Sequence, residues 1–500
     1  MITELEFRSL STQGFNRIPL MVEAFADLET PLSLYLKLAR SKDNGRYSFL
    51  LESVVGGERF GRYSFIGLPA RTLLRASGFG AEALTEVVTD GVVVERAAGN
   101  PLDFVAAYQQ RFRVALSPGL PRFCGGLAGY FGYDAVRHIE KKLEKSCPPD
   151  TLNCPDILLL QCEELAVIDN LSGKLYFIVY ADPSQPEAYA RAKRRLRELR
   201  DQLKYSVSAP VVKPSQPHPV QRSFAKADYL AAVERAKELI AAGDFMQVQV
   251  GQRISKRYTE SPLSLYRALR SLNPSPYMYY YDLGDFQVVG ASPEILVRQE
   301  HTPEGEQKIT IRPLAGTRPR GASMALDKAA EQELVNDPKE RAEHVMLIDL
   351  ARNDIGRIAK TGTVKVTEAF AVERYSHVMH IVSNVEGTLK DGMTAIDVLK
   401  ATFPAGTLTG APKVHAMELI DQLEPTKRGL YGGACGYISY AGDMDVAIAI
   451  RTGIIKDQML HVQAAAGVVA DSIPEMEWRE TEVKARALLR AAELVEEGLE

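Results

Sequence analysis

Two glutamates stand one helical turn apart in the segment from 337 to 344. Asp337 is of a type that caps helices, Pro338 favours the first helical position, and Glu340 completes a capping-box pattern. A helix that begins there places Glu340 and Glu343 on one face, three residues apart. The segment thus presents a pair of carboxylates that could share one ligand.

A second pair of glutamates lies near the C-terminal end. Pro474 favours a helix start that aligns Glu477, Glu480 and Lys484 along one face. If the two pairs face each other, their charges repel unless a cation lies between them, and ligands that are all oxygens point to Mg²⁺. Taken alone, the pattern fits two solvated, charged helix faces better, so the choice depends on the surrounding sequence.

Further residues could bind or transfer protons. The glycine-rich loops 312–321 and 404–413 could bring backbone amides close to an anion, although each alone fits a structural turn and neither has the spacing of a nucleotide-binding P-loop. Arg451 follows an apolar run, where its guanidinium could clamp a carboxylate or form an ion pair with a glutamate. His380 lies in the strand-like run 378–383, where a histidine is usually a packed core residue, although its ordinary pKa suits proton transfer.

Composition narrows the class of protein. The chain has 500 residues, 46% of them hydrophobic and 25% charged, and a net charge of −4, which indicates a large globular protein with no basic footprint for nucleic acid. Its five cysteines form no CxxC pair, which fits a reducing compartment without a zinc site or disulfide framework. The N-terminus lacks an apolar signal-peptide core, and no apolar stretch reaches ~18 residues, so we expect a cytoplasmic protein without a membrane span.

A proline-rich segment, 205–222, separates a first region, 1–204, from a second region, 223–500. Helical periodicity predicts helices at 187–203, 226–242, 325–352, 394–401, 412–421 and 475–498. Short apolar runs between turn residues predict strands at 47–53, 63–66, 157–160, 165–168, 175–180, 286–290, 295–298, 436–440, 446–450 and 460–464. Strands joined mostly by hairpins, with helices between groups of strands, predict an α+β fold with largely antiparallel sheets.

A series of motifs then follows in one order over about 200 residues. They are 291–294 (ASPE), 313–318 (PLAGTR), 343–344 (EH), 349–354 (DLARND), His380, 406–413 (GTLTGAPK), 431–433 (YGG), 451–452 (RT) and 477–484 (EWRETEVK). Together they resemble the chorismate-utilising enzymes. The resemblance implies a two-lobed fold in which largely antiparallel sheets pack as a sandwich, with helices around and between them.

Within that family the chain is similar to the anthranilate-forming branch, the large (component I) subunits of anthranilate synthase, over nearly its full length. Enzymes that form aminodeoxychorismate typically carry a lysine where this chain has Ala315, and those that form isochorismate or salicylate use a lysine base where it has Gln247. Without either lysine, ammonia is the expected nucleophile. One alternative is an aminodeoxychorismate synthase, which Ala315 disfavours. A second is an inactive tryptophan sensor, which the intact glutamates and Arg451 disfavour. A third is a Mg²⁺-dependent phosphoryl-transfer enzyme, which would need a phosphate loop.

The resemblance implies a Mg²⁺-dependent lyase that converts chorismate and ammonia to anthranilate and pyruvate, the first committed step of tryptophan biosynthesis. It implies metal ligation by Glu343, Glu480, Glu340 and Glu477, substrate binding by Gly316, Thr317, Tyr431, Arg451, Ala465, Ala466 and Gly467, and catalysis by His380, Glu294, Thr407 and Lys484. The chain carries no glutaminase motif such as GxCxG, so a separate glutamine amidotransferase subunit (component II) is implied. We expect a heterotetramer of two large and two small subunits.

Feedback inhibition by tryptophan is also implied. Glu52 and Ser53, together with Pro276, Tyr277 and Met278, resemble the two halves of the family's tryptophan site. By themselves these residues fit a strand edge and a turn. The resemblance implies that Glu52 holds the ammonium of tryptophan and that Pro276, Tyr277 and Met278 pack on its indole.

One position departs from the family. The family usually has Gly-Ala-Gly, whose amides are expected to hold a substrate carboxylate, where this chain reads Ala465-Ala466-Gly467. An alanine fits at 465 only if its φ is negative or the strand is slightly shifted.

Overall fold

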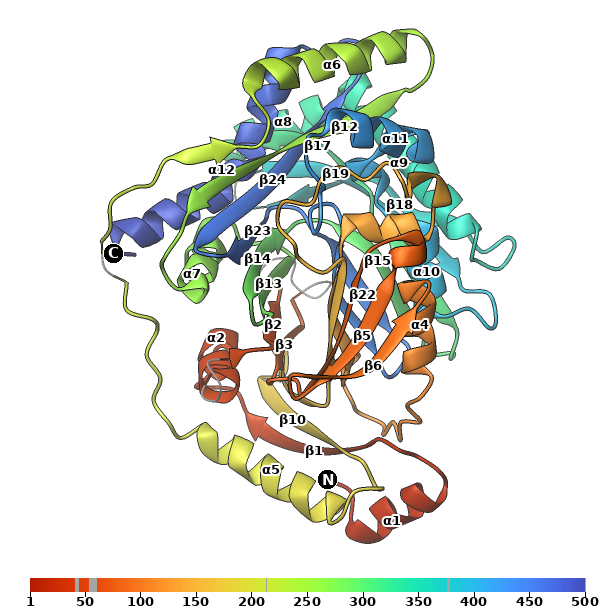
Figure 1. Cartoon of the computed structure of the whole chain (residues 1–500), viewed down its shortest axis with the longest axis vertical. Helices are drawn as coiled ribbons and strands as arrows, with labels where there is room; N and C mark the ends of the chain where they lie inside the picture. Colours follow the sequence, from red (N-terminus) through yellow and green to blue (C-terminus); the bar gives the residue numbers. More distant parts are fainter. Residues whose placement is uncertain (41–44, 54–60, 213, 376–377, 500) are drawn as a thin grey trace.

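The computed structural model describes residues 1–40, 45–53, 61–212, 214–375 and 378–499. Two large sheets pack face to face, and helices cover their outer sides (Figure 1). Every strand pair in the two sheets, as far as the described residues form them, is antiparallel. The predicted α+β fold with a sandwich of antiparallel sheets is confirmed.

The first sheet contains both the earliest strands and the last ones. Its strands are β1 (Ile18–Phe25), β2 (Ser48–Glu52), β3 (Tyr63–Gly67), β9 (Glu164–Asp169), β10 (Lys174–Ala181), β11 (Val220–Arg222), β12 (Gln247–Arg257), β13 (Tyr277–Asp282), β14 (Phe286–Ser292), β20 (Gly410–Ala411), β23 (Thr452–Lys456) and β24 (Met459–Val468). They lie in the order β1-β10-β9-β3-β2-β13-β14-β23-β24-β12-β11, with β20 beside β12.

The second sheet has the same mixed composition. Its strands are β4 (Thr72–Ser77), β5 (Leu84–Thr89), β6 (Val92–Ala98), β7 (Gly126–Phe131), β8 (Ile157–Cys162), β15 (Ile295–His301), β16 (Gln307–Ile311), β17 (Leu314–Pro319), β18 (Lys365–Arg374), β19 (Val378–Thr388), β21 (Ala434–Ser439) and β22 (Met444–Ile448). They lie in the order β17-β19-β16-β15-β22-β21-β7-β8-β4-β5-β6, with β18 beside β19.

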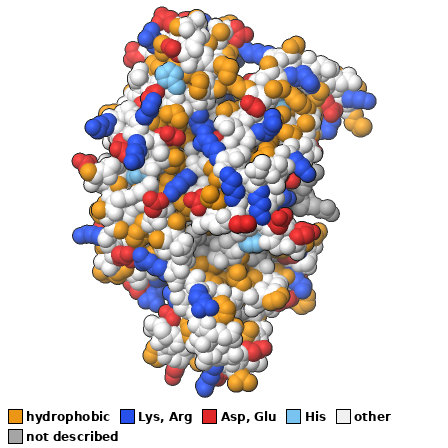
Figure 2. Space-filling view, turned by 90° about the vertical axis from the view of Figure 1, so that its right-hand side faces the viewer, with side chains coloured by type: hydrophobic (Ala, Val, Ile, Leu, Met, Phe, Trp, Pro, Cys, Tyr) orange, Lys and Arg blue, Asp and Glu red, His pale blue; other side chains and the backbone are white. Residues whose placement is uncertain are grey.

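Helices lie against the outer faces of the sheets. They are α1 (Glu4–Thr12), α2 (Pro31–Leu34), α4 (Pro101–Gln109), α5 (Ala188–Gln202), α6 (Lys226–Ala241), α7 (Pro262–Leu272), α8 (Met324–Asn336), α9 (Pro338–Gly356), α10 (Ala395–Thr402), α11 (Lys413–Leu423) and α12 (Pro474–Glu497). The short turns are η1 (Tyr35–Ala39), η3 (Gly80–Glu82), η4 (Tyr133–His138), η5 (Lys141–Leu143) and η6 (Gly406–Leu408). No helix of the described residues is long and apolar enough to cross a membrane. Acidic and basic side chains are interspersed over the face shown in Figure 2.

Strand alternation divides the core into layers. In β8, Ile157 packs in the cluster formed with α4, α9 and α10, whereas its neighbour Leu158 faces the first sheet. Between the sheets, the ring of Phe65 in β3 lies 5.5 Å from that of Tyr437 in β21. Outside the first sheet, α5, α7 and α12 contribute a separate cluster.

Both sheets combine strands from before and after the proline-rich segment. They join where β2 pairs with β13 and where β7 pairs with β21. The segment itself runs from α5 along one side of the molecule to β11 (Figure 1). It is fixed where the Ser215 N–H donates to the Glu496 carbonyl at 2.8 Å, and its last three residues form β11 at the sheet edge. The two predicted regions therefore lie side by side in both sheets.

Several predicted limits differ from the structure. The single helix predicted at 325–352 is wrong, because Asp337 ends α8 and caps α9 by accepting the N–H groups of Lys339 and Glu340. The predicted capping box is also wrong, since the Asp337 N–H donates to the Leu334 carbonyl and Glu340 instead accepts from Arg318. The strand predicted at 446–450 ends at 448. The other predicted helices agree with α5, α6, α10, α11 and α12 within two residues at each end.

Candidate active site

A cavity of about 190 Å³ lies where β12 and β24 of the first sheet approach β17 and β19 of the second. Side chains of α9, α12 and the loop around Thr407 also line it. The predicted site residues that line it are Glu294, Thr317, Glu343, His380, Thr407, Tyr431, Arg451, Ala465 and Lys484. The fold therefore gathers predicted catalytic and binding residues from distant parts of the chain into one space.

Glu294 is the buried carboxyl of this cavity, with 8% of the residue exposed. The Glu294 N–H donates to Ser292 Oγ at 3.3 Å, which fixes the turn after β14. Burial raises the pKa of Glu294 to about 7, although the Thr407 hydroxyl and the charges of Lys484 and Arg451 act in the opposite direction. Thr407 Oγ1 donates to Glu294 Oε1 at 3.1 Å. A carboxyl with this pKa can hold a proton at neutral pH and donate it to a leaving group.

His380 is 3% exposed and has one ring nitrogen already engaged. Its Nδ1 lies 2.9 Å from the Gly316 carbonyl and 3.1 Å from Thr317 Oγ1. A carbonyl can only accept, so Nδ1 carries the proton and Nε2 is left as an acceptor. Burial lowers the pKa of His380, which favours the neutral ring. The ring of Tyr375 packs edge-on against it at 5.6 Å.

Arg451 is held in an unusual backbone conformation. Its φ is 49°, in the left-handed region, and its carbonyl accepts the Ala291 N–H at 3.1 Å. Burial lowers the pKa of the guanidinium, against the opposing effect of the Glu294 charge. Among the described residues its side chain forms no ion pair, which favours the carboxylate clamp over the predicted alternative of a glutamate partner. Backbone strain of this kind is characteristic of functional sites.

The end of β24 forms another wall beside Tyr431. Ala465 has a negative φ and lies opposite Gly251 of β12, where a Cβ would come within 3.3 Å of the Ala465 methyl group. The condition for an alanine at 465 is thus met by its negative φ, and the glycine on the neighbouring strand leaves room for its methyl group. Ala466 is fully buried and does not line the cavity. Gly467 does not line it either, and a Cβ there would lie 2.7 Å from Gln247 Nε2.

The four predicted metal ligands come from two helices, α9 and α12. Glu343 reaches the cavity and accepts from Gln247 Nε2 at 3.2 Å. Burial raises the pKa of Glu343, and the charges of Glu340 and Glu480 raise it further. The carboxylates of the two helices are therefore close enough to repel each other.

Cationic side chains partly neutralise these carboxylates. Lys484 Nζ lies 2.7 Å from Glu480 Oε1 and donates to the Ala465 carbonyl at 2.9 Å. Burial raises the pKa of Glu477, and the Glu480 charge adds to the effect. Within the described part of the chain, no three His, Cys, Asp or Glu side chains are gathered tightly enough to hold a metal ion. The oxygen donors fit Mg²⁺ in type, but they are not collected into a preformed cage.

Residues 70–490 match the family described as chorismate binding enzyme. Anthranilate synthase component 1 of Neisseria meningitidis serogroup A is 56% identical to this chain over 503 residues, with all of both chains covered. The chain belongs to the chorismate-binding enzymes. Anthranilate synthase component 1 of Pseudomonas putida is 52% identical, with 98% of each chain covered. The crystal structure of anthranilate synthase component I from Streptococcus pneumoniae TIGR4 superposes with a TM-score of 0.75 at 36% identity, covering 93% of this chain and 99% of that one.

Two positions at which the resemblance implies a lysine in other branches of the family lie in the cavity. Gln247 and Ala315 both line it, so a lysine at either position would reach the same space. Gly316 does not line it, because its φ of +66° turns the chain and a Cβ there would lie 2.9 Å from Leu334 Cδ1. Its carbonyl accepts from His380 Nδ1, and its role in binding the substrate ring stays a prediction.

A second, larger cavity of about 790 Å³ contains the residues predicted to bind tryptophan. Glu52, Ser53, Pro276, Tyr277 and Met278 all line it, and Glu52 lies directly opposite Met278 in the β2–β13 pair. The Glu52 carboxylate accepts from Arg270 Nε at 2.6 Å and from the Tyr266 hydroxyl. A ligand ammonium would therefore share Glu52 with an arginine.

The β13–β14 strand pair connects residues near the two cavities. Tyr277 of the larger cavity pairs with Ser292 in the β13–β14 ladder, and Ser292 lies two residues before Glu294. One pair of strands, β13 and β14, therefore carries residues of both cavities or of the turn beside them.

Sequence reasoning missed two glutamines of the active site. Gln249 of β12 and Gln463 of β24 line the cavity beside the predicted residues. A strand whose side chains alternate between amide and apolar types places its amides on one face, which predicts polar surroundings there. The run Gln247-Val248-Gln249-Val250 shows this alternation and could have indicated the two glutamines.

Proposed function

We propose that this chain is the large subunit of an anthranilate synthase, which converts chorismate and ammonia to anthranilate, pyruvate and water. The observation that carries the proposal is the cavity itself. It holds a carboxyl with a pKa of about 7, Glu294, close to Arg451, and it has Ala315 and Gln247 where a lysine would favour other chemistry. The names of the full-length relatives support the same assignment.

Substrate carboxylates are held by charge and by backbone amides. Arg451 can bind the enolpyruvyl carboxylate with two parallel N–H donors, because no partner among the described residues occupies its guanidinium. Tyr431 and Ala465 line the same space and would complete the clamp. Thr317 and Thr407 line the same cavity and can fix the ring of chorismate.

Glu294 is proposed as the general acid. Hydroxide is a poor leaving group, so the C4 hydroxyl must receive a proton as ammonia adds at C2. A carboxyl with a pKa of about 7 is partly protonated at neutral pH, and the Thr407 hydroxyl fixes its orientation. The group leaves as water, and Glu294 is left as a carboxylate.

His380 is proposed to take part in the second step. With the proton on Nδ1 and a lowered pKa, its Nε2 is an acceptor rather than a donor. It can orient the C4 hydroxyl in the first step or accept the proton from C2 when pyruvate leaves. Aromatisation of the ring drives this elimination.

Mg²⁺ is proposed as the cofactor, held by Glu343 and Glu480 with Glu340 and Glu477 nearby. The mutual repulsion among these carboxylates, which raises the pKa of Glu343, supports a cation between the helices. When bound, the metal would withdraw charge through the ring carboxylate and make C2 more electrophilic. Lys484 would support the anion or the metal shell, and it must release Glu480 for the metal to bind.

Regulation and assembly belong to the same proposal. Tryptophan would bind in the larger cavity at Glu52, Ser53 and the Pro276–Met278 strand start, and would inhibit the enzyme. Ammonia would come from a glutamine amidotransferase subunit, in a heterotetramer of two large and two small subunits. The designation "component 1" of the relatives supports a partner of this kind. The cytoplasmic location stays a prediction.

The test is product identity. The purified chain would be incubated with chorismate, Mg²⁺ and ammonium, and the products would be separated by chromatography. Anthranilate and pyruvate in equal amounts are expected. Aminodeoxychorismate or isochorismate as the product would move the chain to another branch of the family.

A further inference from the structure

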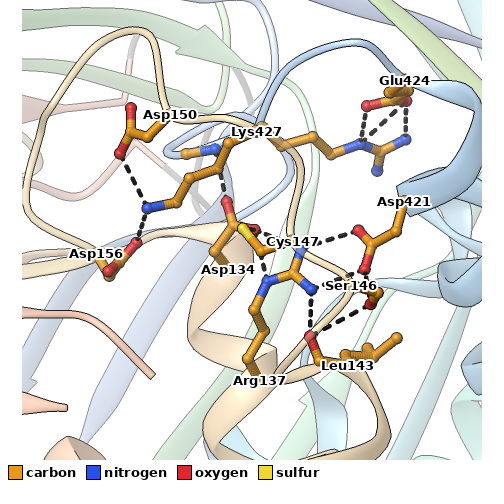
Figure 3. Close-up of polar contacts among 12 residues, drawn as sticks. Asp134, Arg137, Leu143, Ser146, Cys147, Asp150, Asp156, Asp421, Glu424 and Lys427 are labelled. Carbon is orange, nitrogen blue, oxygen red and sulfur yellow. Dashed lines mark hydrogen bonds and ion pairs between the residues drawn. The ribbon is translucent and has the colours of Figure 1, made fainter. Parts of the chain in front are cut away.

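Two arginines bind carboxylates at the C-terminal end of α11, and all five side chains are almost fully buried (Figure 3). Arg137 pairs with Asp421 at 2.7 Å and with Asp134 at 2.8 Å. Arg428 pairs with Glu424 at 2.7 Å, and both side chains are 2% exposed. Asp421 and Glu424 stand three residues apart, and each pairs with a buried arginine, although Arg137 also pairs with Asp134.

Arg428 reaches from this pair to the loop that carries Thr407. One of its terminal nitrogens donates to the Leu408 carbonyl at 2.6 Å, and the other lies 3.3 Å from the Gln249 carbonyl of β12. Leu408 follows Thr407 directly, and Thr407 is the donor to Glu294. The guanidinium therefore fixes the backbone beside the group that orients the acid.

The same pair also contacts two further walls of the cavity. The Arg428 guanidinium lies 5.7 Å from the ring of Tyr431 and 4.6 Å from the ring of Tyr133. Glu424 accepts the Gly251 N–H at 2.8 Å, and Gly251 is the residue opposite Ala465. One ion pair thus joins the Thr407 loop, the β12–β24 ladder and Tyr431.

We propose that the buried Glu424–Arg428 pair is a positioning element of the active site, which holds these three walls in one arrangement without touching the substrate. The donors that Arg428 has left both point to carbonyls of the cavity walls, so the contacts that satisfy the buried guanidinium also fix those walls. Replacing a buried pair by apolar residues is often neutral for stability, so the presence of this pair is weak evidence for a purely stabilising role. The proposal rests on the proposed function, because the walls matter only if the cavity is catalytic.

The Arg137–Asp421 pair supplies a matched control. Its remaining donor goes to the Leu143 carbonyl at 2.6 Å, and Asp421 also accepts from Ser146. These contacts fix the segment 143–146, which does not line the cavity. Asp421→Asn and Glu424→Gln therefore remove the same charge from the same helix end, next to a buried arginine. They differ in what that arginine holds, and also in that Arg137 keeps Asp134 as a second carboxylate partner.

The experiment compares wild type, Glu424→Gln and Asp421→Asn in the full chain. Steady-state rates with chorismate, Mg²⁺ and ammonium separate kcat from KM, the thermal midpoint reports stability, and hydrogen exchange followed by mass spectrometry reports the backbone of 404–412. We expect Glu424→Gln to lower kcat by about 10–100-fold, as a displaced catalytic group does, while Asp421→Asn stays within about 2-fold. Glu424→Gln should lose more stability than Asp421→Asn, because Arg137 keeps Asp134 as a partner. Only Glu424→Gln should exchange faster at 404–412.

Equal effects of the two variants on kcat and on exchange would overturn the proposal. If Glu424→Gln does not fold, Arg428→Lys keeps the charge but cannot bridge Glu424 and the Leu408 carbonyl, and should give the same pattern. An inactive wild-type chain would instead refute the proposed function. Exchange at 404–412 would still decide the positioning role in that case, because it does not depend on turnover.

Discussion

Glutamine in place of Glu294 should make the protein more stable and less active. The pKa of Glu294 is raised from 4.5 to about 7 by burial. At about 1.4 kcal/mol for each pH unit, this means that the ionised form costs the folded state about 3 kcal/mol. Glutamine has the same shape, keeps an acceptor for Thr407 and carries no charge.

The sign of the pH dependence follows from linkage. Below pH 4.5 both the folded and the unfolded protein hold this proton, so Glu294 does not lower the free energy of unfolding. Between pH 4.5 and 7 the folded protein keeps a proton that the unfolded chain releases, and the free energy of unfolding falls as the pH rises. Above pH 7 the whole cost of about 3 kcal/mol is present. The gain from Glu294→Gln should therefore be close to this value at pH 8.5 and small at pH 5.

The assay is denaturant unfolding at these two pH values, together with steady-state rates. Glu304→Gln is the control, because the same chemical change occurs on an exposed residue between β15 and β16. Loss of a general acid should lower kcat by about 10²–10⁴-fold, and the wild-type kcat should fall as the pH rises above about 7. A variant that is no more stable than wild type at pH 8.5, or that keeps its turnover, would refute the assignment.

Three further predictions concern single side chains. His380→Asn should lower kcat by about 100-fold with little change in KM, since Nε2 acts on protons rather than on binding; a large rise in KM alone would argue for a binding role. Arg451→Lys should raise the KM for chorismate by about 10–100-fold, because an ammonium cannot donate two parallel bonds, and an unchanged KM would place the carboxylate elsewhere. Ser53→Phe should raise the tryptophan concentration needed for half-inhibition by about 10–100-fold through overpacking, with turnover intact. Unchanged inhibition in that variant would remove Ser53 from the site.

Local signals in the sequence predicted the helices that carry the acidic residues. Asp337 and Pro338 mark the start of α9, and Pro474 marks that of α12, because helix starts depend on residues adjacent in the chain. The same locality explains the error over 325–352. The periodicity of 325–352 continues across Asp337 and predicts one helix, whereas Asp337 and Pro338 predict a new helix start, and the structure follows the capping signal.

The non-local features could not be predicted in the same way. The pairing of β2 with β13 and of β7 with β21 joins segments far apart in the chain, and register depends on side chains that meet only after folding. Glu424 and Arg428 lie beyond the predicted helix 412–421 with Pro425 between them, and nothing in the local sequence marks them as a buried ion pair. Only burial shows that they join three walls of the cavity.

The central claim is that the cavity around Glu294 and Arg451 turns chorismate and ammonia into anthranilate. The most direct measurement is the fluorescence of anthranilate formed by the purified chain with chorismate and ammonium, at mildly alkaline pH, with Mg²⁺ and with a chelator. We expect fluorescence that grows with time, requires Mg²⁺ and falls when tryptophan is added. Consumption of chorismate without anthranilate, or no consumption under any of these conditions, would contradict the account.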